Sequence, residues 1–202
     1  MIKVEKVTQH ILQSNKKGER TMRKFIIILF SVVFLSGMVN ASDVIVELRA
    51  HYLHPSEKAF RDIYGGGMMY GGEVSIGVWR GLDVWFGGSY FSKTGELTFT
   101  KEETKLEIYP LAGGLKYRLT TGIFDLYAGV GLNYYQYKES NPLGDISKGG
   151  LGYVGKIGSY VRVIGGFLID LYVNYSYCRL QPADFKIDIG GIEAGVGIGY
   201  SF

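Results

Sequence analysis

The sequence predicts an all-β fold, a transmembrane antiparallel up-and-down β-barrel of about eight strands preceded by a helical signal peptide. Three observations predict it. Apolar and polar residues alternate with period two over segments close to ten residues long, and short and long connections between these segments alternate. The composition is rich in glycine and tyrosine and poor in proline, with 30 Gly, 16 Tyr and 4 Pro in 202 residues. Glycine among tyrosine and aliphatic residues, without added proline, is typical of strands with close backbone contacts.

A leader precedes the predicted barrel. A basic start at residues 22–24 is followed by an apolar run over residues 25–35 and then by small residues up to Ala41. This order is the pattern of a secretory signal peptide, and the apolar run is too short for a stop-transfer helix. We expect cleavage between Ala41 and Ser42, and an uncleaved N-terminal membrane anchor is the alternative.

Three regions follow from this interpretation. Residues 1–21 are polar and lack any pattern that would bury a face, so we expect a disordered or non-native extension, with translation starting at Met22. Residues 22–41 are the expected signal peptide, and residues 42–202 are the expected outer-membrane β-barrel.

Charge and cysteine content exclude several classes of protein. Seven of the 22 Lys and Arg residues precede residue 42, against two of the 19 Asp and Glu residues. The predicted mature chain therefore carries a net charge of about −2, which does not favour a nucleic-acid-binding surface. Cys178 is the only cysteine, so neither an internal disulfide nor a cysteine-based zinc site can form. We expect Cys178 to be a small packed residue.

The alternation is clearest at the C-terminus. Between residues 192 and 202 one face carries only apolar side chains, whereas the other carries Glu193, Ser201 and glycines. A strand of a transmembrane barrel crosses the hydrocarbon in about 9–11 residues, with one face toward lipid and the other toward the lumen. The same division predicts eight strands, at 44–53, 70–79, 82–91, 105–118, 124–137, 153–164, 167–178 and 192–202.

The connections between these segments also alternate. Three are short and hairpin-like, at 80–81, 119–123 and 165–166. Four are longer and polar, at 54–69, 92–104, 138–152 and 179–189. An outer-membrane barrel has this arrangement, with long loops outside the cell and short turns in the periplasm, and an even number of strands places both termini in the periplasm. Within the first long connection, the composition of Phe60–Gly72 suggests an ordered loop or a strand extension.

Charged residues recur on the predicted inner face. Because isolated charges in a narrow interior are costly, we expect these residues to pair across it. The first and last strands are neighbours in a closed barrel, so Glu47, Arg49 and Glu193 should lie near one another. The predicted network rigidifies and fills the lumen, and the alternative is a gated, narrow ion path. The network comprises Glu47, Arg49, Glu73, Lys116, Arg118, Lys156, Arg162 and Glu193.

The mature chain resembles the small eight-stranded outer-membrane barrels, an OmpA-, OmpX- and OmpW-like group that includes porin-family proteins. The leader, the glycine-rich run at 128–132 and the C-terminal segment 192–202 carry the resemblance. It implies residence in the bacterial outer membrane among lipids and lipopolysaccharide. It also implies that Tyr200 and Phe202 form the signal that the barrel-assembly machinery recognises.

The resemblance implies a structural or surface-interaction role, and we expect a monomer. A narrow channel or transporter for small solutes is the first alternative, and a lipid-modifying enzyme is the second, since some such barrels use Ser and His to act on lipid A. Only His51 and His54 are available in the mature chain, near Ser56, Glu57 and Ser92. We therefore expect no catalytic residues. We also expect no metal, no cofactor and no nucleic-acid partner.

Overall fold

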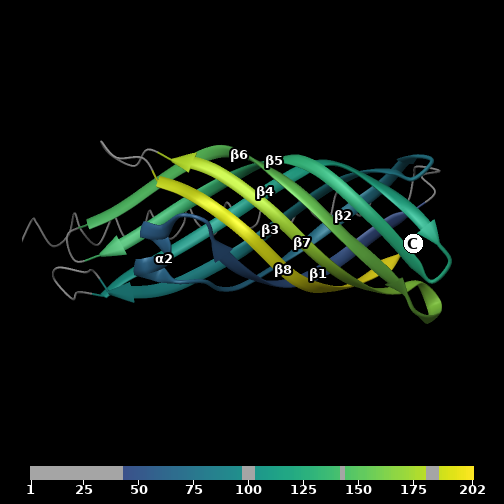
Figure 1. Cartoon of the computed structure of the whole chain (residues 1–202), viewed down its shortest axis with the longest axis horizontal. Coiled ribbons are helices and arrows are strands. Elements are labelled where there is room, and N and C mark those ends of the chain that lie inside the picture. The colour runs from purple at the N-terminus through teal and green to yellow at the C-terminus, as the bar shows by residue number, and fades with distance from the viewer. Residues whose placement is uncertain (1–42, 97–102, 142–143, 181–186) are drawn as a thin grey trace, which may run out of the picture. The chain divides into compact units, whose positions relative to one another are not determined.

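The computed structural model describes residues 43–96, 103–141, 144–180 and 187–202, and these form one closed antiparallel barrel (Figure 1). Each strand pairs with the next along the chain, and the first pairs with the last. The strands are β1 (Val44–Pro55), β2 (Gly67–Trp79), β3 (Leu82–Glu96), β4 (Glu103–Thr121), β5 (Phe124–Asn141), β6 (Gly144–Arg162), β7 (Phe167–Leu180) and β8 (Ile187–Ser201). The helix α2 (Lys58–Tyr64) and the 3-10 turn η1 (Ile164–Gly166) complete the fold. The predicted extension, signal peptide and cleavage site at Ala41 and Ser42 lie outside the described residues.

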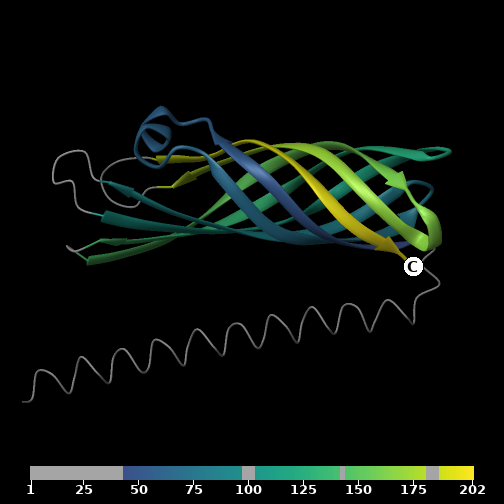
Figure 2. The ribbon, with the colours of Figure 1, turned by 90° about the horizontal axis from the view of Figure 1, so that it is seen from below.

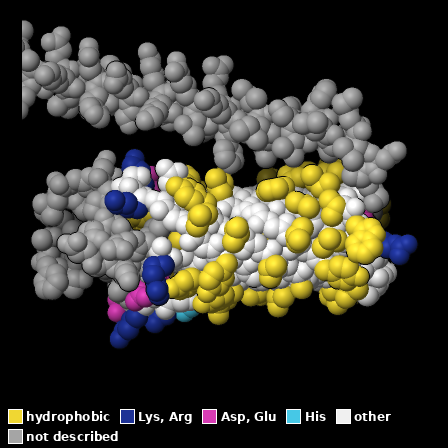
Figure 3. Space-filling view, turned by 90° about the horizontal axis from the view of Figure 1, so that it is seen from above, with side chains coloured by type: hydrophobic (Ala, Val, Ile, Leu, Met, Phe, Trp, Pro, Cys, Tyr) yellow, Lys and Arg dark blue, Asp and Glu magenta, His cyan; other side chains and the backbone are white. Residues whose placement is uncertain are grey.

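The predicted fold class and strand number are confirmed. Each predicted segment lies almost wholly within one strand of the barrel, and the alternation places its apolar residues outside. Leu48, Val130 and Ile198 are each more than two-thirds exposed, whereas inward side chains such as Glu47 and Arg49, on either side of Leu48, are buried. Hydrophobic side chains are spread over the barrel exterior, and charged ones gather near its ends (Figure 3). Among the described residues, no helix is long and apolar enough to cross a membrane.

The barrel closes at its two chain ends. Val46 on β1 lies opposite Tyr200 on β8, and the backbone N–H of Phe202 donates to the carbonyl of Val44 over 2.9 Å. The Phe202 ring packs edge-on against Tyr200, with 4.8 Å between the ring centroids. The end of β8 therefore lies beside the start of β1, while α2 lies at the opposite end of the barrel (Figures 1 and 2).

The short turns are confirmed. The hairpin between β2 and β3 turns through Arg80 and Gly81, whose φ angles of 25° and 85° are both positive. Positive φ at both central residues matches the right-handed twist of the flanking strands, and this conformation favours glycine. Gly122 and Gly165 adopt positive φ in the other two turns.

The prediction of a long loop at 138–152 was wrong. Strands β5 and β6 remain paired through this region, with Lys138 opposite Ser147 and Asn141 opposite Gly144. A polar composition in this region is therefore compatible with continued strand pairing, and it did not mark the end of either strand. In the first connection, the ordered structure expected at Phe60–Gly72 is present as the end of α2 and the start of β2.

Candidate functional site

A charged cluster fills the middle of the barrel. The Glu73 carboxylate on β2 accepts hydrogen bonds from Arg49 Nη1 at 2.6 Å, from Lys116 Nζ at 3.2 Å and from Lys156 Nζ. These four side chains come from β1, β2, β4 and β6, so the cluster ties together strands on different sides of the barrel. All four residues are at most 7% exposed.

Arg49 is the hub of this cluster. Its guanidinium also donates to Glu47 at 3.0 Å and to Asp170 at 2.5 Å, and it lies 4.2 Å from the centre of the Tyr172 ring. On the other side, Tyr160 donates to Glu47 at 2.7 Å and contacts Lys116. The central network is Glu47, Arg49, Glu73, Lys116, Lys156 and Asp170, with three cations and three carboxylates.

A second group of charges closes the end of the lumen near the chain termini. Arg118 pairs with Asp83 at 3.2 Å and with Asp43 at 3.0 Å, and Arg162 pairs with Asp125 at 2.6 Å. Arg118 and Arg162, both placed in the lumen charge network from the sequence, form this separate group and are not part of the central network. The Arg162 side chain is 38% exposed, because β6 ends at this residue and leaves it at the rim.

The expectation that Glu193 lies near Glu47 and Arg49 holds only in part. Glu193 and Arg49 line one cavity, but among the described residues Glu193 does not join the ion pairs of Glu47 and Arg49. The register of β1 with β8 places Glu47 opposite Gly199, Arg49 opposite Gly197 and Glu193 opposite Leu53. Neighbouring strands do share an inner face, but the stagger of the barrel shifts these charges apart along its axis. Glu193 instead accepts hydrogen bonds from Ser176 at 2.8 Å and Asn174 at 3.2 Å.

The lumen contains several inward residues that the predicted charge network did not include. Asp83, Asp125 and Asp170 belong to the charged groups, and the period-two alternation had already placed them on the inner face. Their signal was therefore present, but only part of the inward charges was selected. Tyr127, Tyr160 and Trp85 also fill the lumen, since residues of this size on the inner face leave little free space in an eight-stranded barrel.

The end of the barrel interior beneath α2 is apolar, a feature that the sequence did not predict. Here α2 covers the barrel end with Phe60 and Tyr64, and these rings pack with inward side chains of the strands. Cys178 is fully buried in this cluster, as expected. The outer apolar cluster is Leu53, Phe60, Tyr64, Met69, Phe91, Leu106, Ile108, Tyr135, Tyr137, Cys178 and Ile189.

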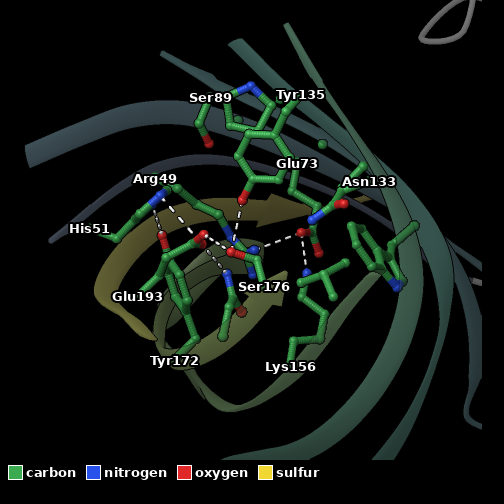
Figure 4. A pocket seen from close by; sticks show the side chains of 18 residues that line it. Arg49, His51, Glu73, Ser89, Asn133, Tyr135, Lys156, Tyr172, Ser176 and Glu193 are labelled. Atoms are coloured by element: carbon green, nitrogen blue, oxygen red, sulfur yellow. Dashed lines mark hydrogen bonds and ion pairs between the residues drawn. The ribbon is translucent and has the colours of Figure 1, made fainter. Parts of the chain in front are cut away.

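A cavity of about 60 Å³ lies within the barrel, lined by residues of the central network and by Tyr135 of the outer apolar cluster. In the close-up, His51 and Glu193 lie together on one side of it and Lys156 lies on the other (Figure 4). Small inward residues on β3 and β4, among them Gly87, Ser89 and Ala112, leave this space open.

This arrangement lacks the geometry of a serine hydrolase. His51 Nδ1 shares a hydrogen bond of 2.9 Å with Tyr172, and His51 Nε2 faces Glu193 at 3.6 Å. In the described part of the chain, no serine hydrogen-bonds to His51, and His54 is exposed. The same residues contain no group of three or more His, Cys, Asp or Glu side chains that could hold a metal ion.

No family model and no curated protein sequence matches the chain. Solved structures do match its fold. Neisserial surface protein A aligns with a TM-score of 0.62 and 15% identity, covering 81% of this chain and all of that one. Ail of Yersinia pestis, solved with the heparin analogue sucrose octasulfate, gives 0.52 and 15%, covering 78% and 98%. The N-terminal barrel of Pseudomonas aeruginosa OprF gives 0.50 and 16%, covering 80% and 98%. The chain therefore has the fold of the small eight-stranded outer-membrane barrels.

Proposed function

We propose that this protein is an integral protein of the bacterial outer membrane with a structural or surface-interaction role, and that its lumen does not conduct. The observation that carries the proposal is the filled interior. A charged group at one end, the central network and the outer apolar cluster succeed one another along the barrel. An eight-stranded barrel has an interior only just wide enough for its own side chains.

The exterior supports residence in a membrane. Large apolar side chains are exposed on all eight strands, which would be an extensive aggregation-prone surface in water but suits hydrocarbon. Tyrosine and tryptophan occur among the exposed residues near strand ends, for example Trp79 at the end of β2 and Tyr117 near the end of β4. Amphipathic rings at such positions fit the interfacial girdles of outer-membrane barrels.

The orientation follows from the connections. The tight turns lie at the same end of the barrel as the start of β1 and the end of β8, and in this class of fold that end faces the periplasm. The projecting hairpins and α2 would then face the exterior and meet lipopolysaccharide. We further propose that the protein is a monomer and that the half-buried Tyr200 and the exposed Phe202, which pack together where the barrel closes, are recognised by the barrel-assembly machinery.

Planar-bilayer recording on purified protein tests the closed lumen. We expect no discrete conductance steps, because the central network and the outer apolar cluster block the axis in succession. Reproducible single-channel steps would contradict the proposal and favour a narrow channel. The outer-membrane location is tested separately by fractionation and by faster gel migration of the unheated protein. Identical lipid A mass spectra with and without the gene are expected if the protein has no lipid-modifying activity.

A further inference from the structure

Glu193 differs from the other buried carboxylates of the lumen. Among the described residues, each of Glu47, Glu73, Asp83, Asp125 and Asp170 has an Arg or Lys nitrogen within 3.2 Å. Glu193 is 6% exposed and has no such recorded partner. The basic group recorded beside it is the imidazole of His51, 3.6 Å from Glu193 Oε2, and an imidazole is largely neutral at pH 8.

The central network does not supply the missing positive charge. Arg49 and Lys156 line the same cavity, but both are engaged by Glu47, Glu73 and Asp170. The central network contains three cations and three carboxylates and is therefore neutral. The central network and Glu193 together carry a net charge of −1. A buried charge without compensation costs several kcal/mol, so a compensating ion or proton is expected nearby.

The surroundings of Glu193 can hold an ion. The side-chain oxygens of Asn133 and Asn174 have no hydrogen-bond partner, although these residues are only 3% and 8% exposed. Both residues line the cavity, together with Ser176 and the hydroxyl-bearing Tyr135. A water-sized guest needs roughly 10–15 Å³ of such space. The cavity of about 60 Å³ therefore has room for a small ion and a few waters.

We propose that this cavity binds a small monovalent cation, held by the Glu193 carboxylate and by neighbouring amide and hydroxyl oxygens. A single carboxylate and a net charge of −1 suit Na⁺ or K⁺. Calcium prefers six to eight oxygens, with several carboxylates among them. The ion would satisfy the one lumen carboxylate that lacks an Arg or Lys partner in the described chain, and would thereby fix the strands β7 and β8 to the opposite wall.

Trp85 offers a direct readout because its indole lines the cavity and is 2% exposed. The second tryptophan, Trp79, is on the exterior, so a Trp79→Phe background leaves Trp85 as the sole emitter. We would titrate this folded protein with NaCl and with KCl at pH 8, replacing choline chloride at constant total chloride. Choline is too large for the cavity and controls for ionic strength.

The expected result is a saturable change in Trp85 emission with Na⁺ or K⁺. Adding Glu193→Gln should weaken the apparent affinity at least tenfold, while the control Glu107→Gln, which removes a half-buried carboxylate paired with Lys105, should leave it unchanged. Each variant is first checked for heat-modifiable gel migration. If Glu193→Gln does not fold, Ser89→Val fills part of the cavity without altering Glu193 and should weaken the response similarly. Trp85 emission that stays unchanged when Na⁺ or K⁺ replaces choline, or an unaltered response in the variant tested, would overturn the proposal.

Discussion

The central network and the outer apolar cluster occupy the same barrel and share several of its strands, yet they fill it by opposite means. In the central network, Glu73 and Arg49 are buried and share one charged hydrogen bond, and each is held by further ones, Glu73 by Lys116 and Arg49 by Asp170. In the outer cluster, Phe91 and Leu106 are fully buried by packing. The first depends on every partner being present, whereas the second degrades gradually as contacts are lost.

The location of each region explains the difference. The outer apolar cluster lies at the end covered by α2, where the barrel wall projects toward water and a folded cap can exclude it. The central network lies at the depth of the exposed apolar band, so its charges have hydrocarbon around them and can be satisfied only by one another. A cluster of paired charges there fixes which side chains meet across the lumen.

The largest expected effect comes from breaking the central network at its shared carboxylate. Glu73→Ala leaves Arg49, Lys116 and Lys156 without their common acceptor. Removing one partner from a buried ionic group costs about 3–5 kcal/mol. Urea unfolding in lipid vesicles, followed by gel migration, should show this loss. Glu107→Ala, which removes a carboxylate at the outer rim, is the matched control and should change stability little. Equal effects of the two substitutions would mean that the network is not a coupled unit.

A charge moved to the other side of the wall should also be costly. Val196 faces outward on β8 and is 52% exposed, between the inward Gly195 and Gly197. Val196→Arg should cost about 2–4 kcal/mol if the residue lies near the bilayer midplane. Vesicle unfolding measures it, with Val196→Leu as the control. Unimpaired insertion and stability of the arginine variant would show that our assignment of the lipid-facing side is wrong.

The outer apolar cluster should respond to loss of its cap by opening locally. Phe60 of α2 is 6% exposed and packs with Tyr64 at a centroid distance of 5.2 Å. Phe60→Ala should cost about 3 kcal/mol, the lower end for a buried aromatic ring, because α2 is a short element at the barrel end. Cys178, the only thiol, lies in this cluster, so its maleimide labelling rate reports the opening. Labelling should accelerate in Phe60→Ala but not in Val196→Leu, and an unchanged rate would contradict the cap.

The sequence could predict the fold and the inner face, but not the pairing of charges within it. The period-two alternation predicts which face of the barrel wall a residue occupies, and the structure confirms that Glu73 and Lys116 face inward. Alternation carries no information on axial stagger, so it could not show that Glu193 bonds to Ser176 and Asn174 and not to Arg49. It also could not locate the rim, so it did not separate Arg162 from the central network. The apolar side chains of Phe91 and Leu106 also face inward, so the rule that inward residues are polar did not predict an apolar cluster at this end of the barrel. The helix that covers the cluster had no strong sequence pattern either.

The smallest expected effect lies at an exposed ion pair outside the apolar band, and it shows how much burial matters. Arg179 on β7 contacts Asp188 on β8 through two hydrogen bonds of 2.7 and 3.0 Å. This hydrogen bonding lowers the pKa of the Asp188 carboxyl. A lowered pKa stabilises the folded state above the ordinary aspartate pKa, and the contribution disappears as the pH falls through the folded-state value.

Arg179→Gln should therefore reduce the urea midpoint slightly at pH 7 and not at all in strong acid. Because water and salt screen this pair, 1 M NaCl should also abolish the difference. A difference that persisted in acid would mean that Arg179 acts through packing on the Tyr177 ring, 5.7 Å away, and not through its charge.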